Sequence, residues 1–195
     1  MSRRNLVALA LSTVLVVAAA EPVMAYTLLS PKRTWATTPV PVRVYTTGNS
    51  TISDGDGGVS AVSGAIRAWA VVGSGTTNQA AVRGEAPATI MLNTNGKICT
   101  GSCLAATLTG YYSGTTIYDA DVYTNTRYSY YSSRENDGCS GEFDIDGIMV
   151  HEVGHVIGLG HSSVTGSTMY PSVSSCNSAN RTLEADDVAG MRALY

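Results

Sequence analysis

The residues best suited to chemistry lie in one stretch of eleven, His151 to His161, which reads H-E-V-G-H-V-I-G-L-G-H. His151 and His155 are four residues apart, so on an α-helix both imidazoles project from one face and can reach the same ion. Glu152 follows the first histidine and lies beside that ion, where a carboxylate can take a proton from metal-activated water. This spacing predicts a metal site with a general base next to it.

The second half of the stretch predicts how a third ligand reaches the ion. Gly158 comes three residues after His155, where a left-handed residue can end a helix and turn the chain back. His161 then supplies a third nitrogen and leaves the fourth tetrahedral position open for water, as a catalytic zinc site requires. All three histidines of the chain lie here. The alternative, a buried helix with structural histidines, does not explain three histidines, a glutamate and a glycine in register.

The pattern H-E-x-x-H-x-x-G-x-x-H resembles the extended signature of the metzincin metalloproteases. Metzincins carry a methionine in a tight turn below the zinc, and here Met169 stands eight residues after His161, followed by Tyr170 and Pro171. That spacing and the M-Y-P ending resemble the matrixin branch, the family of the matrix metalloproteases. The closing segment, Leu183 to Tyr195, resembles the matrixin C-terminal helix with its paired aspartates.

This resemblance implies an α+β, zincin-like catalytic domain: a twisted mixed β-sheet with a backing helix, an active-site helix and a C-terminal helix. It implies one catalytic Zn²⁺ on the three histidines, Glu152 as general base, and Met169 as an apolar floor that does not ligate. Some other metzincins use the tyrosine after this methionine as a ligand, whereas the matrixin arrangement does not. The substrate pocket is expected to be lined by Val150, Tyr170, Pro171 and Val173, the last standing where many matrixins have a tyrosine.

Residues 1–25 read as an export signal. Two early arginines precede the fifteen-residue apolar stretch Leu6–Ala20, and Val23–Ala25 offers small residues for cleavage. Fifteen apolar residues fall short of the ~20 that span a bilayer, so a retained anchor is the less favoured alternative. We therefore expect a secreted, extracellular protein without lasting membrane insertion, whose residues 26–195 form the catalytic domain.

The charge and the cysteine content indicate which partners and which covalent cross-links to expect. The net charge of −3 comes without a basic cluster, which argues against a nucleic-acid partner. Four cysteines in an exported chain indicate disulfides. Of the three pairings they permit, we favour Cys99 with Cys103, which closes a small loop, and Cys139 with Cys176, which ties the segment before the histidine helix to the loop beyond the methionine turn.

Periodicity predicts the elements that hold this site. Leu104–Leu108 resembles the matrixin edge strand that pairs with extended substrate, although a plain sheet edge remains an alternative. Asp144 is a natural N-cap for the histidine helix. Apolar residues at helical spacing, Val62, Ala65, Ile66 and Trp69, predict a backing helix. Further strands are expected at Val40–Tyr45, Ala88–Asn93 and Thr116–Tyr123.

Other metals are less clearly indicated. Matrixins hold a second, structural zinc with histidines at the positions of Ala106 and Asp121, so that zinc is not expected here. Asp119 and Asp121 offer oxygen ligands for Ca²⁺, but solvent-facing strand carboxylates are an equal alternative. The stretch Asp54–Gly58 resembles a calcium loop and fits a plain turn better.

These observations predict a secreted zinc endopeptidase, acting as a monomer on extracellular or extracellular-matrix proteins and peptides. Nothing matches the propeptide whose cysteine plugs the zinc in matrix metalloproteases, and neither that propeptide nor a hemopexin domain is expected. One alternative is a non-catalytic adhesion or binding module on the same fold, whose usual mark would be loss of Glu152. A second, an inhibitor-type partner of peptidases, leaves an intact zinc site unexplained.

Overall fold

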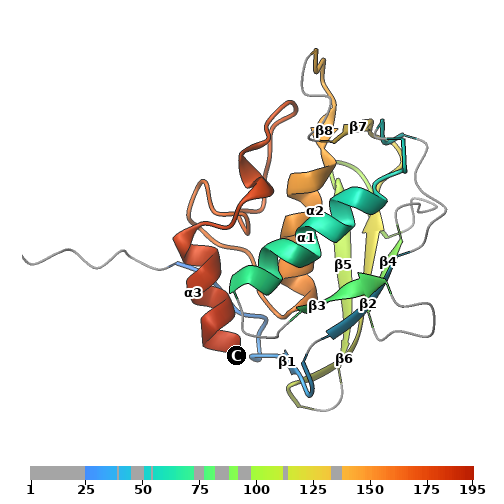
Figure 1. Cartoon of the computed structure of the whole chain (residues 1–195). Coiled ribbons are helices and arrows are strands. Elements are labelled where there is room, and N and C mark those ends of the chain that lie inside the picture. The colour runs from blue at the N-terminus through green and yellow to red at the C-terminus, as the bar shows by residue number, and fades with distance from the viewer. Residues whose placement is uncertain are drawn as a thin grey trace, which may run out of the picture.

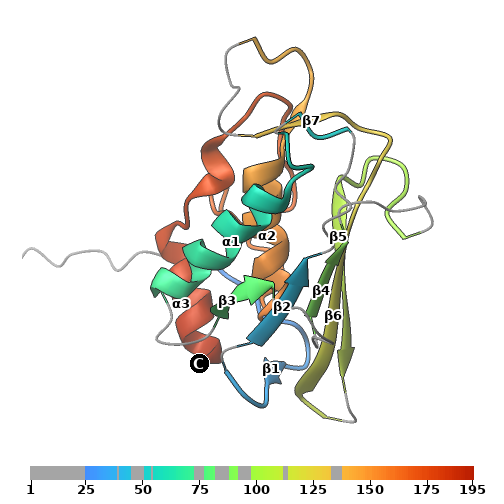
Figure 2. The same cartoon turned by 45° about the vertical axis from the view of Figure 1, so that its right-hand side comes forward.

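The computed structural model describes residues 25–38, 40–44, 51–53, 55–72, 77–81, 88–91, 98–111, 114–132 and 138–195. Figure 1 shows a mixed β-sheet with helices α1 (Val59–Val72) and α2 (Ile145–Val156) on one of its faces. The third helix, α3 (Ala185–Leu194), lies on the side of the helix layer away from the sheet (Figure 2). The α+β arrangement expected from the sequence, with its three helices, is confirmed.

The sheet combines parallel strands with one antiparallel edge. Its strands are hydrogen-bonded in the order β1 (Thr34–Trp35), β6 (Thr116–Thr124), β4 (Ala88–Met91), β2 (Val40–Val44) and β3 (Thr77–Ala81), and β5 (Ala105–Tyr111) is added to β6. Only β5 runs antiparallel to its neighbour, and no other described strand pairs with it. The outer backbone groups of β5 are therefore open to a further strand.

Four of these strands lie within a few residues of those expected from the sequence: β2, β4 and β6 from its pattern, and β5 from the family resemblance. The pattern did not indicate β3, whose sequence T-N-Q-A-A lacks apolar alternation and which forms by pairing with β2. It also missed β1 and the two-residue pair β7 (Tyr130–Tyr131) and β8 (Phe143–Asp144). Elements this short depend on their partners rather than on local sequence.

Helix α1 packs against α2 through the face that the sequence predicted. Val62, Ala65, Ile66 and Trp69 are all buried. The indole N–H of Trp69 donates a 2.8 Å hydrogen bond to the carbonyl of Val150 on α2, so α1 also fixes the position of the histidine helix.

The acidic stretch before α1 works as a helix cap. The Asp56 carboxylate accepts hydrogen bonds from the backbone N–H of Gly58 at 3.1 Å and of Ser60 at 3.0 Å. These bonds satisfy donors that the first turn of a helix leaves free. Asp54 lies outside the described residues, so the choice between a plain turn and a calcium loop stays a prediction.

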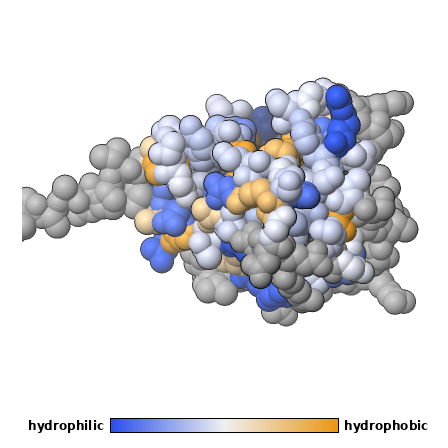
Figure 3. Space-filling model, turned by 90° about the horizontal axis from the view of Figure 1, so that it is seen from above, coloured by the Kyte–Doolittle hydropathy of each residue, from blue (hydrophilic) through white to orange (hydrophobic). Residues whose placement is uncertain are grey.

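Apolar side chains form one core between the sheet and the helices, extending to Met191 and Leu194 of α3. On the face seen in Figure 3, hydrophobic residues form small separate patches among neutral and hydrophilic ones. Of the described helices, none is both long enough and apolar enough to cross a membrane. The expected export signal lies outside the described residues apart from Ala25, so it stays a prediction.

Two disulfides join the pairs favoured from the sequence. Cys99 bonds to Cys103 just before β5, and Cys139 bonds to Cys176, with sequence separations of 4 and 37. The second bond ties the chain ahead of α2 to the loop that follows the methionine turn. In the chain-entropy model, a longer closed loop gives a larger stabilisation.

We therefore expect unequal effects from removing the two disulfides. Replacing Cys139 and Cys176 together by Ala lowers the free energy of unfolding by about 4 kcal/mol, whereas the same change at Cys99 and Cys103 lowers it by about 2 kcal/mol. Urea unfolding of the two double variants beside the unchanged chain measures the difference. Equal losses would show that loop closure does not govern their contribution.

Candidate metal centre

Asp144 is the N-cap of helix α2, as the sequence predicted. The Asp144 carboxylate accepts the backbone N–H of Asp146 at 3.0 Å, and its other oxygen lies 2.6 Å from the Nε of Arg181. Burial raises the pKa of the Asp144 carboxyl, although the Arg181 guanidinium opposes this shift. The start of the helix is therefore anchored to the segment ahead of α3.

Helix α2 ends in a turn that redirects the chain toward the metal-binding face. Gly158 has φ +108°, the backbone N–H of Gly158 donates to the carbonyl of His155 at 3.0 Å, and that of Leu159 donates to Gly154 at 3.0 Å. This pair of bonds is the Schellman motif. A Cβ at Gly158 would also lie 2.3 Å from the carbonyl oxygen of Arg33, so glycine is required here for space as well as for φ.

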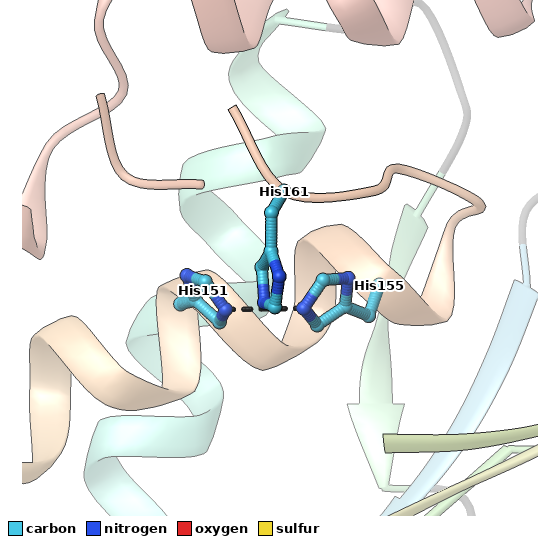
Figure 4. Close-up of side chains that lie close together, drawn as sticks. All are labelled: His151, His155 and His161. Carbon is cyan, nitrogen blue, oxygen red and sulfur yellow. Dashed lines mark hydrogen bonds between the residues drawn. The ribbon is translucent and has the colours of Figure 1, made fainter. Parts of the chain in front are cut away.

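The turn brings the third histidine to the other two. Figure 4 shows the His161 ring pointing between the rings of His151 and His155, which project side by side from α2. Ring centroids are 4.7 Å apart for His151 and His155, 5.3 Å for His151 and His161, and 4.8 Å for His155 and His161. One nitrogen of each ring lies within 4.8 Å of the other two, so a single ion can reach all three.

Backbone carbonyls determine which ring nitrogens face one another. Nδ1 of His151 lies 2.7 Å from the carbonyl oxygen of Thr168, and Nδ1 of His155 lies 2.8 Å from that of Leu159. Because a carbonyl only accepts, both Nδ1 atoms carry the proton, and both Nε2 atoms present a lone pair in the neutral ring. These two Nε2 atoms are 3.0 Å apart.

Two facing lone pairs at this distance repel unless a cation lies between them. Burial lowers the pKa of His151 and of His155 to about 4, so both rings are neutral at physiological pH and cannot share a proton of their own. Neutral imidazole is the form that binds zinc, and carbonyl bonds at Nδ1 are the usual second contacts of zinc-bound histidines. The donor set fits Zn²⁺.

The methionine turn lies directly beneath this part of α2. Met169 is 1% exposed, and a Cβ added at Gly154 would lie 2.3 Å from its Sδ atom. The backbone N–H of Ser162 donates to the Met169 carbonyl at 2.8 Å. This bond joins the turn to the segment that follows His161. Glycine between the two helical histidines therefore makes room for the methionine side chain.

A buried carboxylate holds the turn in place. Asp187, which is fully buried, accepts hydrogen bonds from the Ser167 hydroxyl at 2.5 Å and from the backbone N–H groups of Thr168, Met169 and Glu184 at 2.8, 3.0 and 2.9 Å. The same Thr168 orients His151 through its carbonyl. Asp187 is thus linked to the metal centre through the turn. The sequence resemblance included the paired aspartates, but no sequence pattern pointed to the Thr168 carbonyl.

The Glu152 side chain projects from α2 and contacts the edge strand β5. It is 4% exposed, and its Oε2 accepts a 2.5 Å hydrogen bond from the hydroxyl of Thr107 on β5. Burial raises the pKa of the Glu152 carboxyl. Sequence reasoning did not single out Thr107, because the contact joins residues 45 positions apart.

A cleft of about 790 Å³ runs past the histidines and Glu152. Tyr170, Pro171 and Val173 line it, and their role as a substrate pocket stays a prediction. Val150 is not among the lining residues: this residue of α2 is 3% exposed, and its carbonyl accepts the indole N–H of Trp69 on α1. The opposite wall comes from β5 and the residues just before it, Leu104, Ala105, Ala106, Thr107 and Thr109.

One other group of closely spaced metal-binding side chains occurs in the described part of the chain: Cys139, Glu142 and Cys176. Its two sulfurs form a disulfide, so they are not available as thiolates. Asp119 and Asp121 belong to neither group. Calcium binding at these aspartates, and the expected lack of a second zinc, stay predictions.

Comparison with known proteins identifies one family. The family model described as Matrixin matches residues 83–195. Metalloendoproteinase 4-MMP of Arabidopsis thaliana is 48% identical over 52 residues, which are 27% of this chain and 15% of that protein. Matrilysin of Rattus norvegicus is 41% identical over 66 residues, 34% of this chain and 23% of that protein. Neutrophil collagenase of Homo sapiens is 38% identical over 56 residues, 29% and 12% of the two chains. The matched segments thus span less than a quarter of these relatives.

Replacing Asp187 by Ala tests whether the methionine turn supports the metal site. The change removes the acceptor of four buried donors, so the free energy of unfolding should fall by at least about 3 kcal/mol. The affinity for zinc should fall about 10- to 100-fold, because an outer support of His151 is loosened. Thermal unfolding and zinc titration measure the two effects.

Asp119→Ala, a change at a strand carboxylate of β6, serves as the control and should alter stability by no more than about 0.5 kcal/mol. If Asp187→Ala destabilised the fold but bound zinc with unchanged affinity, the turn would be a scaffold without influence on the metal site.

Proposed function

Because this chain belongs to the matrixin family, we propose that it is a secreted zinc-dependent endopeptidase that hydrolyses peptide bonds of extracellular proteins. The observation that carries this proposal is the convergence of three histidine rings with the Nε2 lone pairs of His151 and His155 only 3.0 Å apart. His151, His155 and His161 are the proposed ligands of one catalytic Zn²⁺. When bound, zinc polarises the scissile carbonyl and lowers the pKa of the attacking water.

Glu152 is the proposed general base. Its carboxylate lines the cleft beside the three rings and is shielded from bulk solvent. It takes a proton from the attacking water and then delivers that proton to the leaving amine. The low exposure of Glu152 strengthens its interaction with both proton partners, because little bulk water competes for them.

The substrate is proposed to bind as an extended peptide along β5. The outer edge of this strand is unpaired within the described residues, and the strand forms one wall of the cleft that passes Glu152. A peptide added to this edge gains main-chain hydrogen bonds with little dependence on its sequence. The opposite wall, with Tyr170, Pro171 and Val173, then contacts one side chain and selects among substrates.

Export is proposed to precede activity, with the signal cut before Tyr26. The backbone nitrogen of Tyr26 lies 2.9 Å from Oδ1 of Asp186, whose other oxygen accepts the Ser162 hydroxyl at 2.6 Å. A new ammonium group at Tyr26 would therefore face a buried carboxylate next to the segment that carries His161. The same oxygen, Oδ1, also lies 2.6 Å from the backbone nitrogen of Ala25, so the contact supports a new N-terminus in this segment and does not select Tyr26 over Ala25.

Glu152→Gln tests the enzymatic proposal. The amide keeps the shape and the hydrogen-bonding capacity of the side chain but cannot take a proton, so kcat for casein or gelatin cleavage should fall about 100- to 10,000-fold. Zinc content and thermal unfolding should stay close to those of the unchanged chain. Glu184→Gln, a change at the exposed N-cap glutamate just before α3, is the matched control and should retain full activity.

A wild-type rate in Glu152→Gln would remove the general-base role. A complete lack of cleavage by the unchanged zinc-loaded chain, across a library of peptides, would instead favour the binding module on the same fold.

A further inference from the structure

One contact of the general base has no counterpart in the sequence pattern. Thr107 of β5 places its hydroxyl 2.5 Å from Oε2 of Glu152 and 3.3 Å from the Glu152 carbonyl oxygen. This side chain joins the edge strand to the histidine helix across 45 residues of sequence.

The Thr107 hydroxyl matters because the Glu152 carboxylate is buried and needs a hydrogen-bond donor. Glu152 is 4% exposed, and an ionised carboxylate with so little water around it needs donors from the protein. Within the described residues, the Thr107 hydroxyl is the side-chain donor that meets this carboxylate. This hydrogen bond at Oε2 holds the otherwise freely rotating end of the glutamate in one orientation, on a residue that lines the cleft.

Thr107 is itself held firmly. Its Cα is in register with Val122 in the antiparallel pairing of β5 with β6, so neighbouring ladder bonds fix its backbone. Its β-branched side chain has restricted rotation about χ1. The hydroxyl is therefore preorganised, and orienting Glu152 requires little further ordering when substrate binds.

We propose that Thr107 is a positioning residue for the general base: its hydroxyl holds the Glu152 carboxylate so that one oxygen points at the attacking water. This inference rests on the proposed function of Glu152. Thr107 also lines the cleft on the strand along which the peptide is proposed to lie. Thr107 thus connects the proposed peptide-binding edge of β5 to Glu152, the proposed general base.

Thr107→Val tests this role, because valine has nearly the shape of threonine and lacks the hydroxyl. In the zinc-loaded full chain, kcat should fall about 10- to 100-fold, the usual effect of losing a hydrogen bond to a charged group. KM should change less than about 3-fold, and Thr107→Ser should restore kcat to within about 3-fold of the unchanged chain, because serine keeps the donor. Thr107→Ala is measured as a second variant without the hydroxyl. If valine disturbs the packing, the alanine variant still reports the loss of the hydrogen bond.

Thr116→Val, at the opposite end of β6, controls for exchange of a strand hydroxyl and should leave kcat and KM unchanged. Zinc content and the midpoint of thermal unfolding are recorded for every variant. A rise in KM with unchanged kcat would assign Thr107 to peptide binding and overturn the inference. So would an equal loss of kcat in Thr107→Ser and Thr107→Val.

A double-mutant cycle separates a role through Glu152 from an independent one. Glu152→Asp shortens the carboxylate beyond reach of the hydroxyl, so adding Thr107→Val to it should lower kcat by less than about 2-fold. Full multiplication of the two losses would contradict the inference. If the unchanged chain cleaves substrate but Thr107→Val and Thr107→Ala are fully active, the inference fails while the proposed function stands; if the unchanged chain cleaves nothing, the proposed function fails first.

Discussion

The repulsion between two imidazole lone pairs is the constraint on which this structure depends. Hydrogen bonds to the carbonyls of Thr168 and Leu159 place the protons of His151 and His155 on Nδ1, and so turn both Nε2 atoms toward the same point. Burial keeps both rings neutral, so no proton of their own relieves the contact. A fold that builds this arrangement into its interior gains stability when a divalent cation occupies it.

Segments far apart in sequence hold this arrangement. Gly158 turns the chain so that His161 arrives, and the N-terminal segment supports that turn, because Gly160 donates its backbone N–H to the Thr27 carbonyl at 2.9 Å. From the other end of the chain, Asp187 fixes the methionine turn and through it the Thr168 carbonyl. The metal centre therefore depends on contacts from both ends of the domain, and the sheet contributes the wall that carries Thr107.

The sequence predicts the site better than it predicts the contacts that tune it. The spacing of three histidines is a local property of a helix and a turn, so ligands separated by ten residues could be inferred without the fold. The strands β2, β4 and β6 carry enough patterning to be recognised, and β5 was expected from its resemblance to the matrixin edge strand. Thr107, the Thr168 carbonyl and the burial of Val150 could not be inferred, because each depends on how α2 meets β5, the methionine turn or α1. Strand β3 was missed for the same reason, since its pairing with β2 supplies what its composition lacks.

Zinc K-edge X-ray absorption on the purified chain, combined with its metal content, measures whether three imidazoles hold one zinc. We expect one zinc per chain with three imidazole nitrogens at about 2.0–2.1 Å and no sulfur ligand, since Met169 lies under the helix rather than on the metal. Substitution of His161 by Ala should reduce the number of imidazole ligands to two. Material that binds no stoichiometric zinc, or whose spectrum shows sulfur or fewer than three imidazoles in the unchanged chain, would contradict this expectation.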